Sequence, residues 1–151
     1  MFKKLVPWFF VVVVLFGLDR LLKYYFIKNP SEVIGKGFLS GVDFSLAKNS
    51  GIAFGISFNK TILIIITIIL ILVLIKLLVQ FFLERKFLEV VGLGMIIVGA
   101  FSNLIDRLRY GFVIDYINVV WFTVFNLADS LITIGVVLLL WSTFYKPLDK
   151  K

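Results

Sequence analysis

The stretch TILIIITIILILVLIKLLVQFFL, from Thr61 to Leu83, decides the fold class of this chain. Its side chains are mostly apolar, and only Lys76 and Gln80 carry a charge or an amide inside the run. Its length matches the ~20 residues that an α-helix needs to cross the hydrocarbon core of a bilayer. A helix that is apolar on all faces is buried in lipid or in a large protein core. We therefore predict a transmembrane helix here.

Three further apolar segments have a similar length. They cover residues 5–27, 87–105 and 125–145. Apolar residues make up 61% of the 151-residue chain, and its mean hydropathy is +1.07. A water-facing domain of this size cannot bury so much apolar surface. The sequence therefore predicts a membrane α-helical protein with four transmembrane helices in a single domain.

Basic residues mark one end of each predicted span. Lys3 and Lys4 precede the first span, and the link between the second and third contains Arg85. Three lysines follow the fourth span: Lys146, Lys150 and Lys151. The positive-inside rule makes this side cytoplasmic, so both termini are expected there. No A-x-A site follows the first span, which we expect to remain uncleaved.

The two longer connections, about residues 28–60 and 106–124, then lie on the outer side. The first contains GFLSGVDFSLAKNSGIAFGIS (residues 37–57), in which glycines separate short runs rich in Phe, Val and Ile. This pattern is typical of strands and turns and predicts a small sheet on the outer membrane surface. The second contains GFVIDYINVVWFTVF (residues 111–125), which suits a strand or an aromatic interfacial segment.

The residue types that are missing exclude several kinds of site. The chain has no cysteine and no histidine, so it has no disulfide, thiol nucleophile, zinc–cysteine site or histidine-based triad. Only carboxylates are left as side-chain ligands for a metal. The net charge is +7, but the basic residues flank apolar runs as topology signals do. Without a basic helix or aromatic platform, we expect no nucleic-acid partner.

Four aspartates fall at the outer level of the predicted spans: Asp19, Asp106, Asp115 and Asp129. A charge in or at the edge of a span costs free energy, so each needs a partner or a task. Lys23 lies four residues after Asp19, which puts both on one helix face. Arg107 adjoins Asp106. These neighbours favour structural ion pairs for Asp19 and Asp106.

Asp115 and Asp129 lack such neighbours. Neither has a basic residue within four positions, and mainly apolar residues surround both. Two buried carboxyl groups that face each other would share one proton. One would act as a base toward water while the other donates to a carbonyl oxygen, as in aspartic proteases. For Asp129 alone, a carboxylate stabilised by a helix N-terminus explains the position equally well.

Three asparagines are expected at the same outer level: Asn49, Asn103 and Asn126. Their amide groups can both donate and accept hydrogen bonds, which suits them to hold an extended peptide or a polar lipid group. Turn formation and helix capping are the alternative for Asn49 and Asn126 taken separately.

Five stretches together form a specific signature that covers nearly the whole chain. They are DRLLK (19–23), NSGIAFG (49–55), GAFSNLIDR (99–107), GFVIDYI (111–117) and FNLADSLITIG (125–135). In this order they resemble the motifs of lipoprotein signal peptidase, the type II signal peptidase of bacteria.

The resemblance implies an aspartyl endopeptidase with four transmembrane helices and a small β-cradle on the outer face of the cytoplasmic (inner) membrane. Its expected partners are membrane lipids and diacylglyceryl-modified prolipoproteins, which it would cleave before the lipidated cysteine. It implies no metal or organic cofactor, and inhibition by globomycin-like cyclic peptides. Asp115 and Asp129 match the catalytic pair. The substrate-binding positions matched are Asn49, Gly51, Asn103, Arg107 and Asn126, and the structural ones are Asp19, Lys23 and Asp106.

Two residues depart from the family pattern. Arg20 stands where the family often has Gln, and Ser102 stands where it usually has Gly. Serine is small, so we expect close helix contact to survive at Ser102. Arg20 adds a charge near the outer surface, where we expect it to alter contacts with lipid headgroups.

Two other functions fit parts of the pattern. A proton- or ion-conducting protein could use intramembrane carboxylates as relay sites, and an assembly partner would need no activity at all. A relay would place acidic groups at several depths of the bilayer, whereas here they gather at one face. That placement favours a site close to the outer surface.

Overall fold

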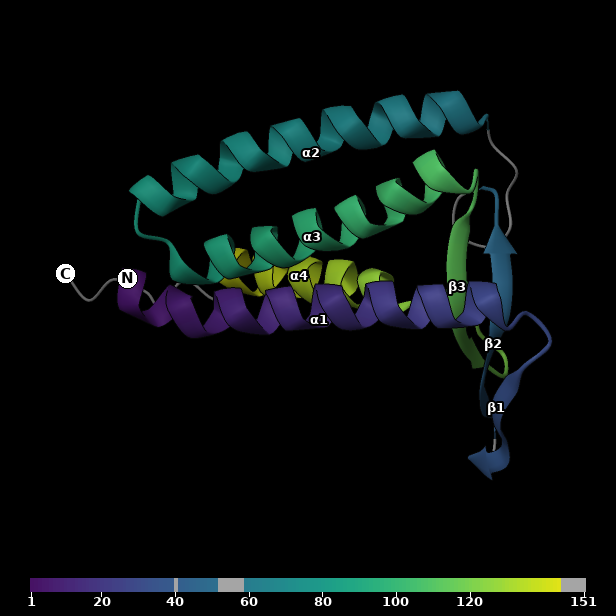
Figure 1. Ribbon diagram of the computed structural model, residues 1–151. Coiled ribbons are helices and arrows are strands. Elements are labelled where there is room, and N and C mark those ends of the chain that lie inside the picture. Colours follow the sequence, from purple (N-terminus) through teal and green to yellow (C-terminus); the bar gives the residue numbers. More distant parts are fainter. Residues whose placement is uncertain (40, 52–58, 145–151) are drawn as a thin grey trace.

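The computed structural model describes residues 1–39, 41–51 and 59–144, with the backbone alone for 36–39. Four long helices lie along one another, and a small sheet crosses one end of them (Figure 1). The helices are α1 (Phe2–Lys28), α2 (Lys60–Leu83), α3 (Phe87–Arg109) and α4 (Leu127–Phe144). All four are long and apolar enough to cross a membrane. The prediction of four transmembrane helices is confirmed.

Helix α3 extends four residues beyond the predicted end at residue 105 and stops at Arg109. After residue 105 the chain has no glycine or proline before Gly111, which adopts a φ of +87° and turns the chain into the sheet. Arg107 and Arg109 lie in its last turn, where positive charge stabilises a helix C-terminus. We had expected Asp106 and Arg107 in the outer connection, but both lie on the helix.

Helix α4 begins at Leu127, two residues after the expected start at Phe125. The backbone of Phe125 instead pairs with Ile117: its N–H donates to the Ile117 carbonyl oxygen at 3.0 Å, and its carbonyl accepts from Ile117 N–H at 2.8 Å. The expected end of this span at residue 145, and the three lysines after it, lie outside the described residues.

The sheet has three antiparallel strands in the order β1 (Val33–Leu39), β2 (Val42–Asn49) and β3 (Val113–Val119). The small sheet predicted in the first outer connection is thus present and gains its third strand from the second one. Ala47 of β2 faces Asp115 of β3 in the register. Residues 52–58, which include Gly55 of the second motif, lie outside the described part of the chain.

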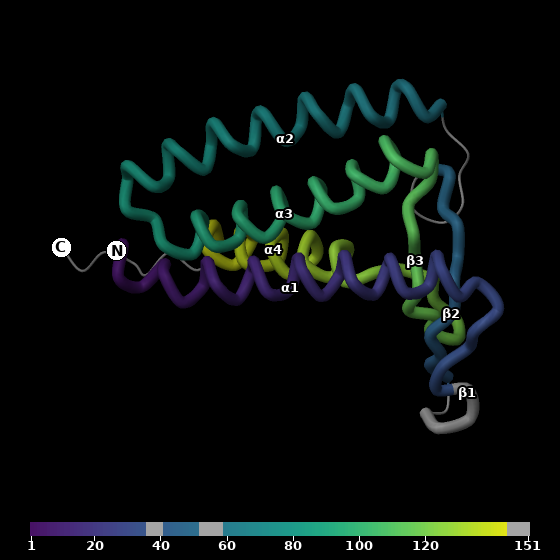
Figure 2. The backbone as a smooth tube through the Cα atoms, viewed as in Figure 1, coloured from purple at the N-terminus to yellow at the C-terminus, as the bar shows by residue number. Residues whose placement is uncertain are grey.

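Helix α3 forms the centre of the bundle and carries most of its buried side chains. It packs closely on α4 through glycines, because small residues let two helix backbones approach. A Cβ atom added at Gly135 would lie 2.5 Å from the carbonyl oxygen of Gly92, and one at Gly99 would overlap the carbonyl oxygen of Ala128. The N-terminus and the α2–α3 connection lie at the end opposite the sheet (Figure 2).

We predict that Gly99→Ala lowers the thermal unfolding midpoint of the protein in detergent. The new methyl group would meet the Ala128 carbonyl, and overpacking of this kind costs about 1–3 kcal/mol. Gly17→Ala is the matched control, because nothing lies within 4 Å of a Cβ atom there and alanine favours a helix over glycine. Equal midpoints for the two variants would contradict the close packing of α3 on α4.

Candidate active site

Asp115 and Asp129 reach one site from different elements, β3 and the first turn of α4. Asn126, which immediately precedes α4, touches both of them. Its side-chain amide donates to Asp115 Oδ1 at 2.6 Å, and its backbone N–H donates to Asp129 Oδ2 at 3.2 Å. The two carboxyl groups therefore lie on either side of a single asparagine.

Asn126 is also the N-cap of α4. Its side-chain oxygen accepts from the backbone N–H of Asp129 at 2.9 Å, while the Asp129 side chain accepts from its backbone N–H. This reciprocal pair is a capping box, which satisfies two backbone donors at the start of the helix. The helix-terminus role considered for Asp129 and the capping role considered for Asn126 are thus both present. Only one carboxyl oxygen of Asp129 is used for this purpose.

The other oxygen of Asp129 accepts from Asn103 of α3. Asn103 Nδ2 donates to Asp129 Oδ1 at 2.8 Å, and Asn103 Oδ1 accepts from Lys23 Nζ at 2.7 Å. An ammonium group can only donate, so it fixes which end of the Asn103 amide faces it. Lys23 therefore determines that Asn103 presents its NH₂ group to Asp129.

Asn49, at the end of β2, completes the shell around Asp115. Its amide donates to Asp115 Oδ2 at 3.1 Å, and its oxygen accepts from Gly51 N–H at 3.1 Å. The turn-forming role considered for Asn49 is therefore present together with a contact to Asp115. Among the described residues, every hydrogen bond to the carboxyl group of Asp115 or Asp129 comes from a neutral amide group.

Burial makes Asp115 a weaker acid than an ordinary aspartate. Its side chain is almost fully buried, and burial together with the negative charge of Asp129 raises the pKa of Asp115 from 3.8 to about 6. The hydrogen bonds from Asn49 and Asn126 oppose this rise without cancelling it. Asp115 therefore keeps its proton at a pH at which an exposed aspartate has lost it.

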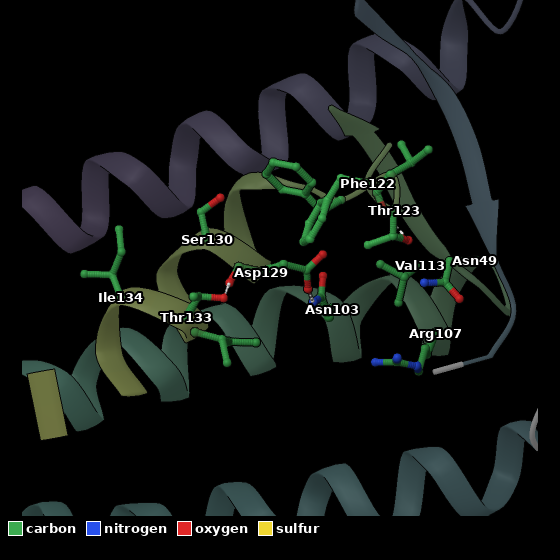
Figure 3. Close-up of a pocket in the computed structure, with 13 residues that line it drawn as sticks. Asn49, Asn103, Arg107, Val113, Phe122, Thr123, Asp129, Ser130, Thr133 and Ile134 are labelled. Atoms are coloured by element: carbon green, nitrogen blue, oxygen red, sulfur yellow. Dashed lines mark hydrogen bonds between the residues drawn. The ribbon is translucent and has the colours of Figure 1, made fainter. Parts of the chain in front are cut away.

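A cavity of about 550 Å³ opens beside Asp129. In Figure 3, Asp129, Ser130 and Thr133 of α4 stand across from Asn103 and Arg107 of α3. Apolar side chains such as Val113, Phe122 and Ile134 form much of the remaining wall. A largely apolar cavity with a few convergent polar groups is the usual form of a ligand site.

The predicted site residues divide into two groups around this cavity. Asn49, Asn103, Arg107 and Asp129 line it, whereas Asp115, Asn126 and Gly51 are not part of its lining. Asp115 and Asn126 connect to it through their hydrogen bonds. Sequence reasoning missed Thr123, Ser130 and Thr133 as lining residues. Thr133 could have been found, since it follows Asp129 by four positions and so shares its helix face.

Asp19, Lys23 and Asp106 form a charge cluster behind the cavity. Lys23 Nζ lies 3.2 Å from Asp19 Oδ2 and 2.8 Å from Asp106 Oδ2, and all three side chains are fully buried. The predicted Asp19–Lys23 pair is present. The expected pairing of Asp106 with Arg107 is wrong. Successive residues point about 100° apart on a helix, so Asp106 faces α1 while Arg107 faces the cavity.

Arg20 joins this cluster, so its charge is paired inside the protein; its expected effect on lipid headgroup contacts stays a prediction. Its Nη1 lies 2.6 Å from Asp106 Oδ1 and also donates to the backbone oxygen and the Oγ of Ser102, at 3.1 and 3.2 Å. Ser102 in turn donates to Asp19 Oδ2 at 2.6 Å. The two residues that depart from the family pattern therefore contact each other, and each binds one aspartate of the cluster: Arg20 binds Asp106 and Ser102 binds Asp19.

Asp19 also reaches the start of α4. Its Oδ1 accepts from the Tyr116 hydroxyl at 3.0 Å and from the backbone N–H of Ala128 at 3.2 Å. Burial and the nearby Asp19 carboxylate raise the pKa of Tyr116, so its hydroxyl stays a donor. The cluster thus holds both β3 and α4, the two elements that carry Asp115 and Asp129.

Comparison with known proteins identifies the family. Residues 11–145 match the family model described as signal peptidase (SPase) II. The chain belongs to the signal peptidase II family. It is 35% identical to the lipoprotein signal peptidase of Streptococcus pneumoniae over 133 residues, which cover 86% of this chain and 87% of that protein. The lipoprotein signal peptidase of Bartonella tribocorum is 40% identical, over 82% of this chain and 78% of that protein.

Solved structures give the same result for the fold. A bacterial membrane enzyme solved by the in meso method matches this signal peptidase with a TM-score of 0.82 at 28% identity, over 96% of this chain and 92% of that chain. A second bacterial membrane enzyme gives 0.73 at 30% identity, over 93% and 94%. This member of the family is therefore a bacterial membrane protease with the fold predicted from its sequence.

We predict that Lys23→Met lowers the unfolding midpoint of the peptidase strongly. The substitution leaves Asp19 and Asp106 buried with one cation fewer, and breaking a buried ion pair costs about 3–5 kcal/mol. Lys28→Met is the matched control, because Lys28 lies on the same helix with an exposed side chain. Thermal unfolding of the purified proteins in detergent measures both effects. A Lys23→Met protein as stable as the control would show that the buried cluster does not hold the bundle together.

Proposed function

We propose that this signal peptidase II removes signal peptides from diacylglyceryl-modified prolipoproteins by cleaving before the lipidated cysteine, with Asp115 and Asp129 as the catalytic pair. The observation that carries the assignment is that Asn126 binds one oxygen of each carboxyl group at the edge of a cavity. The names of the relatives support the substrate class.

The surroundings of the pair support an aspartic-protease mechanism. Among the described residues, both carboxyl groups accept hydrogen bonds from neutral amides. In the same part of the chain, no cation forms an ion pair with either group, so the pair can keep one proton. In the proposed mechanism the ionised carboxylate takes a proton from the attacking water, and the neutral carboxyl donates to the carbonyl oxygen of the scissile peptide. Collapse of the tetrahedral intermediate breaks the C–N bond, and a proton passes to the leaving amine.

The cavity supplies groups for a substrate that is partly in lipid. Its apolar wall includes Phe122, Ile132 and Ile134, which can contact the apolar side chains of a signal peptide. Asn49, Asn103 and Thr133 offer hydrogen bonds to an extended backbone. We assign Arg107, which can only donate, to carbonyl oxygens of the substrate.

We further propose that the sheet and the active site lie on the outer side of the cytoplasmic membrane. Lys3, Lys4, Arg85 and Lys86 gather at the opposite end, where the N-terminus and the α2–α3 connection lie (Figure 2). The positive-inside rule assigns that end to the cytoplasm. A site at the outer end lets the acyl chains of the substrate stay in hydrocarbon while water reaches the scissile bond.

A gel-shift assay on a diacylated prolipoprotein, with and without globomycin, tests this function. We expect the purified protein to convert the substrate to the shorter form, and globomycin-like cyclic peptides to block the conversion by filling the cavity. A proton-conducting protein or an inactive assembly partner would leave the substrate intact under the same conditions. Among the described residues, the aspartates of α1, α3 and α4 all lie toward the sheet end, which does not suit a relay across the bilayer.

We predict that Asp115→Asn and Asp129→Asn each reduce cleavage by about 10²–10⁴-fold, the range that general acid–base groups contribute. Both variants are expected to insert and fold, because asparagine has nearly the same size as aspartate and keeps one acceptor oxygen for an amide neighbour. Asp43→Asn is the matched control, since Asp43 lies in the same sheet and contacts Ser45 and Asn118. Near-normal cleavage by either variant of the pair would refute the catalytic assignment.

We predict that Arg107→Ala lowers kcat/KM about 10- to 100-fold, because a hydrogen bond to a charged group contributes about 1.5–3 kcal/mol. Arg109→Ala is the matched control. Arg109 lies two residues away on the same helix, outside the cavity lining, with its guanidinium 5.3 Å from the centre of the Tyr110 ring. Equal effects of the two substitutions would remove the role given to Arg107.

A further inference from the structure

A second cavity lies at the end of the helices opposite the active site. It has a volume of about 500 Å³ and opens between the first half of α1 and the last turns of α2, with α3 behind it. Its walls are apolar throughout, and include Phe2 and Val13 on α1, Phe82 on α2 and Val98 on α3. None of the residues assigned to the active site lines it.

A glycine keeps this groove open. Gly94 of α3 is part of the lining, and a Cβ atom added there would meet no heavy atom within 4 Å. Its neighbours Gly92 and Gly99 differ, because a Cβ atom at either would collide with α4. Gly92 and Gly99 are thus explained by helix packing, whereas Gly94 leaves space that no described side chain fills.

The groove is as deep as one leaflet of a bilayer. On α1 its lining runs from Phe2 to Val13, which at 1.5 Å per residue is about 17 Å. Half of a hydrocarbon core is about 15 Å. A transmembrane helix of another protein would extend through both leaflets, whereas the acyl chains of one lipid end at this depth. The dimensions therefore suit a lipid.

Basic residues are close to the lining residues of the groove along the chain. Lys3 and Lys4 stand between the lining residues Phe2 and Leu5, and Arg85 follows Phe82 by three positions. Among the described residues, the one ion pair at the end of the helices opposite the sheet joins Lys86 to Glu84 at 2.6 Å. The charges of Lys3, Lys4 and Arg85 are therefore free to meet a phosphate. Basic pockets between transmembrane helices bind anionic headgroups in this way.

We infer that this groove binds an anionic phospholipid, with its acyl chains against α1, α2 and Gly94 and its phosphate among Lys3, Lys4 and Arg85. This lipid site is separate from the peptidase site and does not depend on the proposed catalytic pair.

Trp8 provides a direct probe, because it lines the groove. The chain has three tryptophans, so Trp121→Phe with Trp141→Phe leaves Trp8 as the single fluorophore. This protein is reconstituted in phosphatidylcholine bilayers that contain the same fraction of either brominated phosphatidylglycerol or brominated phosphatidylcholine. We expect the anionic lipid to quench Trp8 with a relative association constant at least about fivefold higher, the factor expected from one cation near the surface.

Two sets of variants separate the groove from its charges. Gly94→Leu fills the groove and is expected to abolish the excess quenching by phosphatidylglycerol. Gly17→Leu is the matched control, since Gly17 is another helical glycine with open space around its Cβ position, and it should keep that excess. Replacing Lys3, Lys4 and Arg85 together by Gln should remove the headgroup preference while quenching by brominated phosphatidylcholine persists.

Three results would overturn the inference. Equal quenching by the two lipids would exclude headgroup selection, and an unchanged excess in Gly94→Leu would place the lipid elsewhere. Absence of quenching by either lipid, together with cross-linking of two copies through the groove, would show that protein occupies it. Cleavage of prolipoprotein does not enter any of these readouts, so the lipid site and the proposed function can fail independently.

Discussion

The contact between Lys23 and Asn103 couples the fold of this peptidase to its chemistry. Lys23 is fully buried, and its ammonium group meets two aspartates and the oxygen of Asn103. A buried cation is tolerated only when it is paired and hydrogen-bonded. These demands hold α1 against α3 and at the same time fix the orientation of the Asn103 amide. Asp129 therefore accepts a hydrogen bond from the Asn103 NH₂ group, whose orientation is fixed by Lys23 behind the cavity.

Asp19, Asp106, Asp115 and Asp129, at the sheet end of the helices, differ in their partners. Asp19 and Asp106 contact the cations Arg20 and Lys23 in a buried ion-pair cluster. Among the described residues, the carboxyl groups of the other two accept hydrogen bonds only from neutral amides, and burial raises the pKa of Asp115. Residues of one type, located within one small region, are thus separated into an ion-pair cluster and a site suited to hold a proton.

Local patterns predicted much of this arrangement. Apolar length alone located the four helices, and the spacing of Asp19 and Lys23 predicted their contact. Long-range contacts were not accessible in the same way. Nothing near Asp106 in the sequence indicates that its partners lie on α1, and the Arg20–Ser102 contact joins positions 82 apart. The register that places Ala47 opposite Asp115 likewise depends on how the two connections meet.

The proposed shared proton is tested most directly by infrared spectroscopy of the purified protein in detergent across a pH titration, with Asp115→Asn subtracted from the wild type. A carboxyl group is neutral below its pKa and charged above it. Since the pKa of Asp115 is raised to about 6, the difference spectrum should show a protonated carboxyl band that disappears as the pH rises through about 6. A band that has already gone near pH 4, as for an ordinary aspartate, would contradict the proposed proton-sharing site.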